Sequence, residues 1–123
     1  MKVVIIEDEF LSQRYLADLI KKNFPTFEIL AMLDSIDLSI DWLSNNTIDL
    51  IFMDVTLSDG DCSRILDSVK IKSPIIFTTA LINIDYLIKR FDKTYLLNKP
   101  IRERELKNIV NSILGIDHMK NIN

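Results

Sequence analysis

Cysteine is scarce in this sequence of 123 residues, with Cys62 as the single example. One thiol excludes an internal disulfide bond and a metal centre built from several cysteines, and it agrees with a reducing compartment. An excess of basic residues is also lacking, because 15 Lys and Arg face 18 Asp and Glu for a net charge of -3. Without an overall cationic field, we expect no direct nucleic-acid binding by this chain.

Long hydrophobic runs are lacking as well. The first run, Val3 to Ile6, stops at Glu7 and Asp8, which makes it too short for a signal-peptide core or a transmembrane helix. We therefore expect a cytoplasmic protein with no membrane segment. A hydrophobic fraction of 48% over this length suits one domain, expected over residues 1–116, with residues 117–123 as a disordered tail or the start of a linker.

What the chain does contain is a series of short apolar segments. They lack polar alternation, as strands of a parallel sheet do when helices cover both faces. The segments are Val3–Ile6, 27–33, Leu50–Met53, Pro74–Phe77 and Tyr95–Leu97. Their ends recur every 20 to 26 residues, the length of a strand plus a crossover helix. We predict an α/β fold with a doubly wound five-stranded parallel sheet.

Helices are indicated between these segments. Apolar residues recur at three-and-four spacing within residues 15–20, 36–43 and 106–114, which predicts three amphipathic helices. Ser35 is a predicted N-cap residue for the helix after the second apolar segment, and Asp61 for a third helix expected after Leu50–Met53. The apolar pattern is weakest for the third and fourth helices, which are expected after Leu50–Met53 and after Pro74–Phe77.

Polar and charged residues follow the predicted strands. In parallel sheets the carboxyl ends of neighbouring strands share one edge, so these side chains should converge. They are Glu7 and Asp8, then Asp54, then Thr78 and Thr79, then Lys99 and Pro100. Clustered carboxylates repel unless a cation shares the site, and oxygen ligands suit Mg²⁺. A metal, a lysine and a hydroxyl together suit a phosphoryl group.

Each of these residues also has a purely structural interpretation. Asp54 alone would more often be a turn or cap residue, and Glu7 and Asp8 could cap the first helix. Thr79 could likewise be a cap, and Lys99 could be solvated. Their joint placement at one edge favours a shared site. Asp54 is then the candidate nucleophile, because a carboxylate can accept a phosphoryl group as an acyl phosphate.

The motifs "IIEDE", "IFMDVTLSDG", "IIFTTA" and "NKPI" occur in this order, and with their spacing they resemble the receiver domain of two-component response regulators. The resemblance covers about residues 2–115. It implies the flavodoxin-like strand order 2-1-3-4-5. It also implies Asp54 as the phosphoacceptor, with Mg²⁺ held by Glu7, Asp8, Asp54 and the backbone carbonyl of Thr56.

The resemblance assigns two further residues to the site and raises one discrepancy. The family's hydroxyl falls on Thr79 and its lysine on Lys99, which is followed by Pro100 in an expected cis peptide. The switch aromatic of the family normally stands three residues before the lysine, where this chain has Leu96. Tyr95 stands one residue earlier, so alternation should turn it to the opposite face unless the strand carries a bulge.

The segment "LINIDYLIKRF", residues 81–91, is unusually apolar for a fourth helix. Leu81 also stands where receivers of the LytTR type commonly have an aromatic. The apolar side chains can be buried core, or they can leave an exposed patch that would suit a homodimer. Receivers usually dimerise through the fourth helix, fifth strand and fifth helix. The residues concerned are Leu81, Ile82, Ile84, Leu87, Ile88 and Phe91.

Within the family, "LDSIDLSIDWL", "LSDGDCSRI" and "SPIIFTTA" resemble regulators of the LytTR type (LytR/AlgR-like), whose output domain binds DNA. The resemblance thus implies a sensor histidine kinase as phosphodonor and a DNA-binding domain beyond residue 123. The transfer is stoichiometric, so we expect no enzyme.

Two other functions stay open. One is a phosphorylation-independent interaction module with a receiver fold. The other is an aspartyl phosphatase of the haloacid dehalogenase type, which needs a second carboxylate two residues after the nucleophile, where this chain has Thr56.

Overall fold

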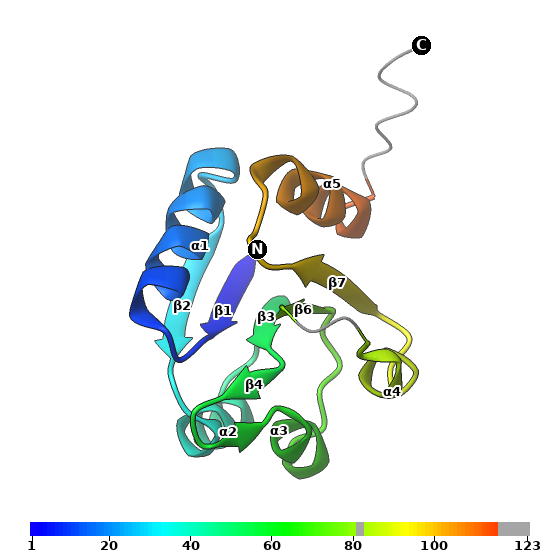
Figure 1. Cartoon of the computed structure of the whole chain (residues 1–123). Helices are drawn as coiled ribbons and strands as arrows, with labels where there is room; N and C mark the ends of the chain where they lie inside the picture. Colours follow the sequence, from blue (N-terminus) through cyan, green and yellow to red (C-terminus); the bar gives the residue numbers. More distant parts are fainter. Residues whose placement is uncertain (81–82, 116–123) are drawn as a thin grey trace.

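A parallel sheet with helices on both faces forms the protein (Figure 1). The computed structural model describes residues 1–80 and 83–115. Among these residues the sheet has the order β2-β1-β3-β6-β7. Its strands are β1 (Lys2–Ile6), β2 (Glu28–Leu33), β3 (Leu50–Asp54), β6 (Ile75–Thr79) and β7 (Thr94–Asn98). Because β6 and β7 are the fourth and fifth strands of this sheet, the predicted order 2-1-3-4-5 is confirmed.

The helices divide between the two faces of the sheet (Figure 1). One face carries α1 (Phe10–Asn23) and α5 (Glu103–Ile113), and the other carries α2 (Ile36–Asn45), α3 (Ser63–Ser68) and α4 (Asp85–Ile88). Each face buries its own apolar cluster, which we call the α1/α5 core and the α2/α3/α4 core. In the described part of the chain, no helix is long and apolar enough to span a membrane.

The central strand β3 explains where the site lies. It pairs with β1 on one side and β6 on the other, so helices cover both of its faces and all five of its residues are buried. The apolar run of β3 ends at Asp54, which pairs with Thr78 of β6. Strand β6 extends through Thr79, two residues beyond its predicted end at Phe77. The threonines therefore belong to the strand itself.

One of the two predicted helix caps is confirmed. Ser35 is the N-cap residue of α2, and its Oγ accepts a hydrogen bond from the N–H of Leu38 at 3.2 Å. The prediction for Asp61 is wrong, because α3 begins one residue later, with Cys62 in the N-cap position. Asp61 instead accepts a hydrogen bond from the N–H of Ser63 at 2.8 Å, and its backbone belongs to a strand.

That strand is part of a small antiparallel hairpin, which the apolar pattern does not predict. Strand β4 (Thr56–Leu57) pairs with β5 (Gly60–Asp61) directly after β3. Gly60 has a φ of +141°, and a Cβ there would stand 3.0 Å from a methyl group of Ile36, so the turn requires glycine. Both carboxylate oxygens of Asp59 accept from the N–H of Ile36, at 3.0 and 3.1 Å. The hairpin is thereby fixed to the first turn of α2.

The apolar residues of the fourth-helix segment are mostly core. Ile84 and Leu87 are 2% and 0% exposed, and Ile88 and Phe91 pack against the same α2/α3/α4 core. Of the two alternatives, these four residues therefore favour buried core over an exposed patch, since the sheet face has room for more than one narrow stripe. Leu81, Ile82 and the predicted tail 117–123 lie outside the described residues.

Candidate functional site

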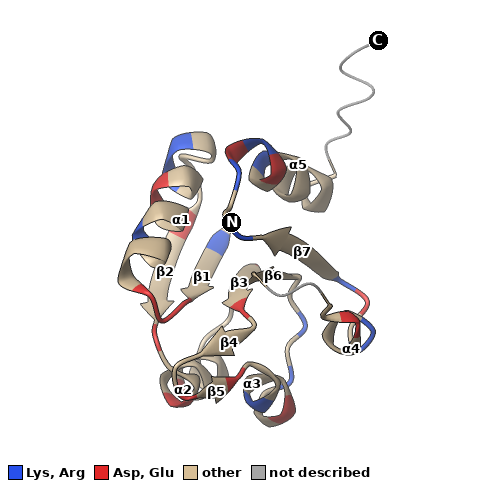
Figure 2. Cartoon of the chain, viewed as in Figure 1, with Lys and Arg blue, Asp and Glu red and all other residues tan. Residues whose placement is uncertain are grey.

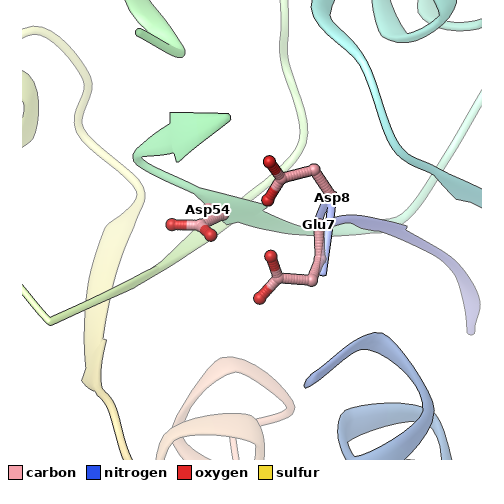
Figure 3. Close-up of side chains that lie close together, drawn as sticks. All are labelled: Glu7, Asp8 and Asp54. Carbon is pink, nitrogen blue, oxygen red and sulfur yellow. The ribbon is translucent and has the colours of Figure 1, made fainter. Parts of the chain in front are cut away.

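Three carboxylates meet at the carboxyl edge of the sheet (Figure 3). Glu7 and Asp8 follow β1, Asp54 ends the neighbouring β3, and one oxygen from each lies within 4.8 Å of the others. Glu7 and Asp54 are buried, with 4% and 8% of their surface exposed. Figure 2 shows this acidic colour at the β1–α1 junction and at the end of β3. The predicted convergence of these three carboxylates is confirmed.

Lys99 supplies the positive charge of this site. Its Nζ donates to Oε1 of Glu7 at 2.5 Å and to Oδ2 of Asp54 at 2.9 Å. The backbone N–H of Lys99 donates to the carbonyl of Thr79 at 2.8 Å, which holds the lysine at the end of β6 and β7. The Lys99–Pro100 peptide bond is cis, as predicted. Lys99 is thus a bridge between the two buried carboxylates.

The protonation of Lys99 follows from this environment. Burial by itself lowers the pKa of the ammonium group, but hydrogen bonds and charge from Glu7 and Asp54 outweigh it and raise the pKa above its ordinary value of 10.5. Lys99 therefore stays charged at neutral pH and offsets part of the carboxylate repulsion.

Helix capping does not account for the two acids after β1. The N-cap residue of α1 is Glu9, and its side chain makes no capping hydrogen bond. Glu7 uses Oε2 to accept from the N–H of Glu9 at 3.2 Å, and its backbone carbonyl accepts from the side-chain amide of Gln13 at 3.1 Å. Asp8 is half-buried and directs its carboxylate toward the other two acids (Figure 3). Both residues thus belong to the acidic cluster.

The two predicted threonines lie at the same edge of the sheet. Thr56 opens β4, and its N–H lies 3.4 Å from Oδ1 of Asp54. Thr79 is the last residue of β6 and is 2% exposed. Its neighbour Thr78 pairs with Asp54, and its own carbonyl accepts from Lys99. The backbone therefore brings the predicted phosphoacceptor, metal-binding and phosphate-binding residues to one edge.

The predicted switch residues occupy opposite faces of β7. Tyr95 and Leu96 pair in regular register with Ile76 and Phe77 of β6, without a bulge. Tyr95 packs against the α1/α5 core, whereas Leu96 packs against the α2/α3/α4 core. The sequence prediction that Tyr95 points away from the fourth helix is confirmed. An aromatic side chain at Tyr95 cannot contact α4 in this arrangement.

The donor set of the site fits a hard divalent cation. Three carboxylates against one ammonium group leave an excess of negative charge at this partly buried edge of the sheet. The potential ligands are all oxygens, and Mg²⁺ prefers oxygen ligands while keeping several waters. Glu7, Asp8 and Asp54 each offer one carboxylate oxygen to such an ion. Lys99 contacts both Glu7 and Asp54, so such an ion would share these two carboxylates with the lysine.

The sequence analysis did not predict the contacts that the β4–β5 hairpin makes with α2 and α4. Asp59 holds α2, and Asp61 accepts a hydrogen bond from the hydroxyl of Tyr86 in α4 at 3.2 Å. The Asp-Gly dipeptide at residues 59–60 is a signal for a hairpin turn and could have revealed the element. Nothing in the sequence pattern indicated its partners in α2 and α4.

The one thiol near the site should be unreactive in the native protein. Burial raises the pKa of Cys62 to about 12, with Asp61 and Asp54 adding to the rise. At pH 8 only about one thiol in ten thousand is then a thiolate, the reactive form. We expect a chromogenic disulfide reagent to leave Cys62 unmodified in native protein and to react fully in denaturant. Rapid labelling of the native chain would contradict this burial.

Comparisons with known proteins identify related sequences. The family model for the response regulator receiver domain matches residues 3–111. The sensory transduction protein LytR of Staphylococcus epidermidis is 31% identical, with 98% of this chain and 49% of the relative covered. Sensory transduction protein LytT of Bacillus subtilis is also 31% identical, with 87% and 45% covered. The chain thus spans about half the length of these relatives.

Solved structures show the same fold. The crystal structure of the response regulatory domain of MrkE from Klebsiella pneumoniae has a TM-score of 0.81 and 28% identity, covering 94% of this chain and 96% of that one. The family match, the strand order and the acidic edge agree with one another. This chain belongs to the family of response regulator receiver domains, and its curated relatives are regulators of the LytT and LytR type.

Proposed function

We propose that this chain accepts a phosphoryl group on Asp54 and thereby switches its surface between two arrangements. The observation that carries the proposal is the meeting of Glu7, Asp8 and Asp54 with Lys99 at one edge of the sheet. A structural ion pair would need one acid for one lysine. The surplus of carboxylates here suits a site for a cation and an anionic group.

The chemistry assigned to Asp54 is a nucleophilic transfer. One carboxylate oxygen forms a bond to phosphorus while the bond from phosphorus to the donor group breaks, and the donor keeps that electron pair. The product is an acyl phosphate. Because β3 is buried on both faces, Asp54 is held with little freedom at the strand end, which favours a reactive geometry.

The surrounding residues have distinct roles in this proposal. Asp8, Asp54 and the carbonyl of Thr56 would hold Mg²⁺, with Glu7 close by, and the ion would neutralise charge between the carboxylates and the phosphoryl oxygens. The ammonium group of Lys99 moves from Asp54 to a phosphoryl oxygen while keeping Glu7 as its partner. The hydroxyl of Thr79 donates to a second oxygen.

The partners follow from the family and its relatives. We propose a sensor histidine kinase as phosphodonor, which would place the reaction in the cytoplasm. Since the relatives are about twice as long as this chain, we further propose a DNA-binding output domain of the LytTR type beyond residue 123. We also propose a homodimer through α4, β7 and α5, on the resemblance to the family alone, with Leu87 of α4 buried in the core and Tyr86 exposed.

The two other functions have less support. In an aspartyl phosphatase the position of Thr56 would carry a carboxylate, and here it lies exposed in the hairpin with no acidic group. An interaction module that is never phosphorylated would not need three converging carboxylates. Retained turnover of a phosphate ester would favour the phosphatase, and lack of any phosphoryl adduct would favour the module.

A small phosphodonor tests the proposal directly. Acetyl phosphate with Mg²⁺ should add one phosphoryl group to the protein, seen as a mass increase by intact-protein mass spectrometry. Asp54→Ala should abolish the adduct completely because it removes the acceptor oxygen. Asp34→Ala is the matched control, since Asp34 is an exposed carboxylate that follows β2 at the same edge, and it should be phosphorylated like the wild type. An adduct that persists in Asp54→Ala would contradict the proposal.

A further inference from the structure

The hydroxyl of Tyr86 in α4 contacts a hairpin that starts directly beside the phosphoacceptor. Its Oη donates to Oδ2 of Asp61 at 3.2 Å. Tyr86 is 53% exposed, so apolar burial does not explain its position. The pKa of the phenol is raised, by burial first and by Asp61 second, so it stays protonated and remains a donor. The contact is a hydrogen bond to a charged acceptor, which is stronger than a neutral one.

Asp61 is itself connected to the site by a short path. It pairs with Thr56 across the β4–β5 hairpin, and Thr56 lies two residues after Asp54. The following residue, Cys62, donates its N–H to the carbonyl of Val55 at 2.8 Å. The hairpin therefore follows any displacement of the chain that leaves β3.

The other end of the contact is a short helix. Helix α4 has four residues, Asp85 to Ile88, and its inward side is held by Ile84 and Leu87 in the α2/α3/α4 core. Tyr86 faces outward from this short element and fixes its orientation relative to the hairpin. A change at the hairpin would thus change the surface that α4 presents.

The usual route between the site and this helix is not available here. Tyr95 packs against the α1/α5 core, and Leu96, which faces the α4 side, has no polar group. The hydrogen bond of Tyr86 with Asp61 is instead a polar contact that links α4 to the hairpin beside the phosphoacceptor.

We infer that the Tyr86–Asp61 hydrogen bond is a positioning contact that holds α4 in the arrangement belonging to the unphosphorylated site. This inference rests on the proposed phosphoacceptor function. A phosphoryl group on Asp54 and the ligation of Thr56 shift the hairpin and weaken the contact. By linkage, a contact made in the unphosphorylated arrangement opposes phosphorylation, so its removal favours phosphorylation.

Removal of one hydroxyl tests the inference. In Tyr86→Phe we expect beryllofluoride with Mg²⁺, a phosphoryl mimic, to bind about two- to tenfold more tightly than in the wild type, the range for one partly exposed hydrogen bond. Titration followed by amide shifts of α4 in NMR spectra measures this affinity. Tyr95→Phe is the matched control, because it removes the same group on the opposite face, and its affinity should equal that of the wild type. Unchanged or weaker binding in Tyr86→Phe would overturn the inference.

A second measurement separates this inference from the proposed function. Without any mimic, amide hydrogen exchange at Leu87, Ile88 and Lys89 should be about two- to tenfold faster in Tyr86→Phe, because α4 opens more readily. Equal exchange rates in the two proteins would overturn the positioning role. A wild type that binds no mimic would contradict the phosphoacceptor function, while the exchange comparison would still decide whether Tyr86 holds α4.

Discussion

Replacing Lys99 by methionine should lower the free energy of unfolding by about 2–3 kcal/mol in magnesium-free buffer at pH 7. The substitution keeps most of the side-chain length and removes the charge that bridges Glu7 and Asp54. Loss of one partner from a fully buried ion pair costs roughly 3–5 kcal/mol. The cost is smaller here because 23% of the lysine side chain is exposed and water can reach the carboxylates. Urea unfolding followed by circular dichroism measures the difference.

Magnesium should restore part of this stability. A cation that binds only the folded protein stabilises it increasingly with concentration, and in Lys99→Met it also relieves the carboxylate repulsion. Lys93→Met is the control, because Lys93 is exposed, and it should stay within about 0.5 kcal/mol of the wild type. A Lys99→Met protein as stable as the wild type without magnesium would show that these ion pairs contribute nothing to folding.

Replacing Phe52 by alanine should cost about 3–5 kcal/mol of stability, the range for truncating a buried phenylalanine. Phe52 is 0% exposed in β3, between β1 and β6, and it packs in the α1/α5 core. The cavity would lie two residues before Asp54. Since the neighbouring strands are fully packed, they can collapse only partly into the space.

Phe10→Ala is the matched control for this truncation. Phe10 opens α1 and is 65% exposed, so its loss removes little buried surface. Its stability should stay within about 0.5 kcal/mol of the wild type in the same urea titration. A small effect of Phe52→Ala, comparable with Phe10→Ala, would contradict the central position of β3.

The large sheet was predictable because its strands are apolar on both faces. The segment of β3 lacks any polar alternation, which is typical of a strand covered on both faces. Spacing of the segments then gave the crossovers. The apolar pattern does not predict the strand order, because any order of five parallel strands would satisfy the same pattern. That part of the prediction depended on the resemblance.

The acidic site was predictable because parallel strands end at one edge. Glu7 and Asp54 are far apart in sequence, and their convergence follows from the pairing of β1 with β3. The sequence does not predict which charged groups of the cluster contact one another. That Lys99 bridges Glu7 and Asp54, rather than facing solvent, depends on the β6–β7 register and the backbone bond to Thr79.

The region around α3 and α4 was the least predictable. Its elements are short, so hydrophobic periodicity over one turn carries little information. The N-cap of α3 was predicted one residue too early, at Asp61, because Asp61 belongs to strand β5 of the hairpin and α3 begins after it. Tyr86 and Asp61 lie 25 positions apart and contact each other only through their side chains. Hydrophobic periodicity cannot predict a contact of this kind.

The chemical identity of the phosphorylated group tests the central claim most directly. An acyl phosphate on Asp54 is cleaved by neutral hydroxylamine, whereas phosphate esters of serine and threonine resist it. After incubation with acetyl phosphate and Mg²⁺, reductive trapping with borohydride followed by peptide mass spectrometry should place the modification on Asp54 alone. Hydroxylamine should release inorganic phosphate and leave a hydroxamate on Asp54, so the phosphoryl mass increment is lost and only the small mass increase of the hydroxamate remains. A hydroxylamine-stable adduct, or one mapped to another residue, would contradict the account.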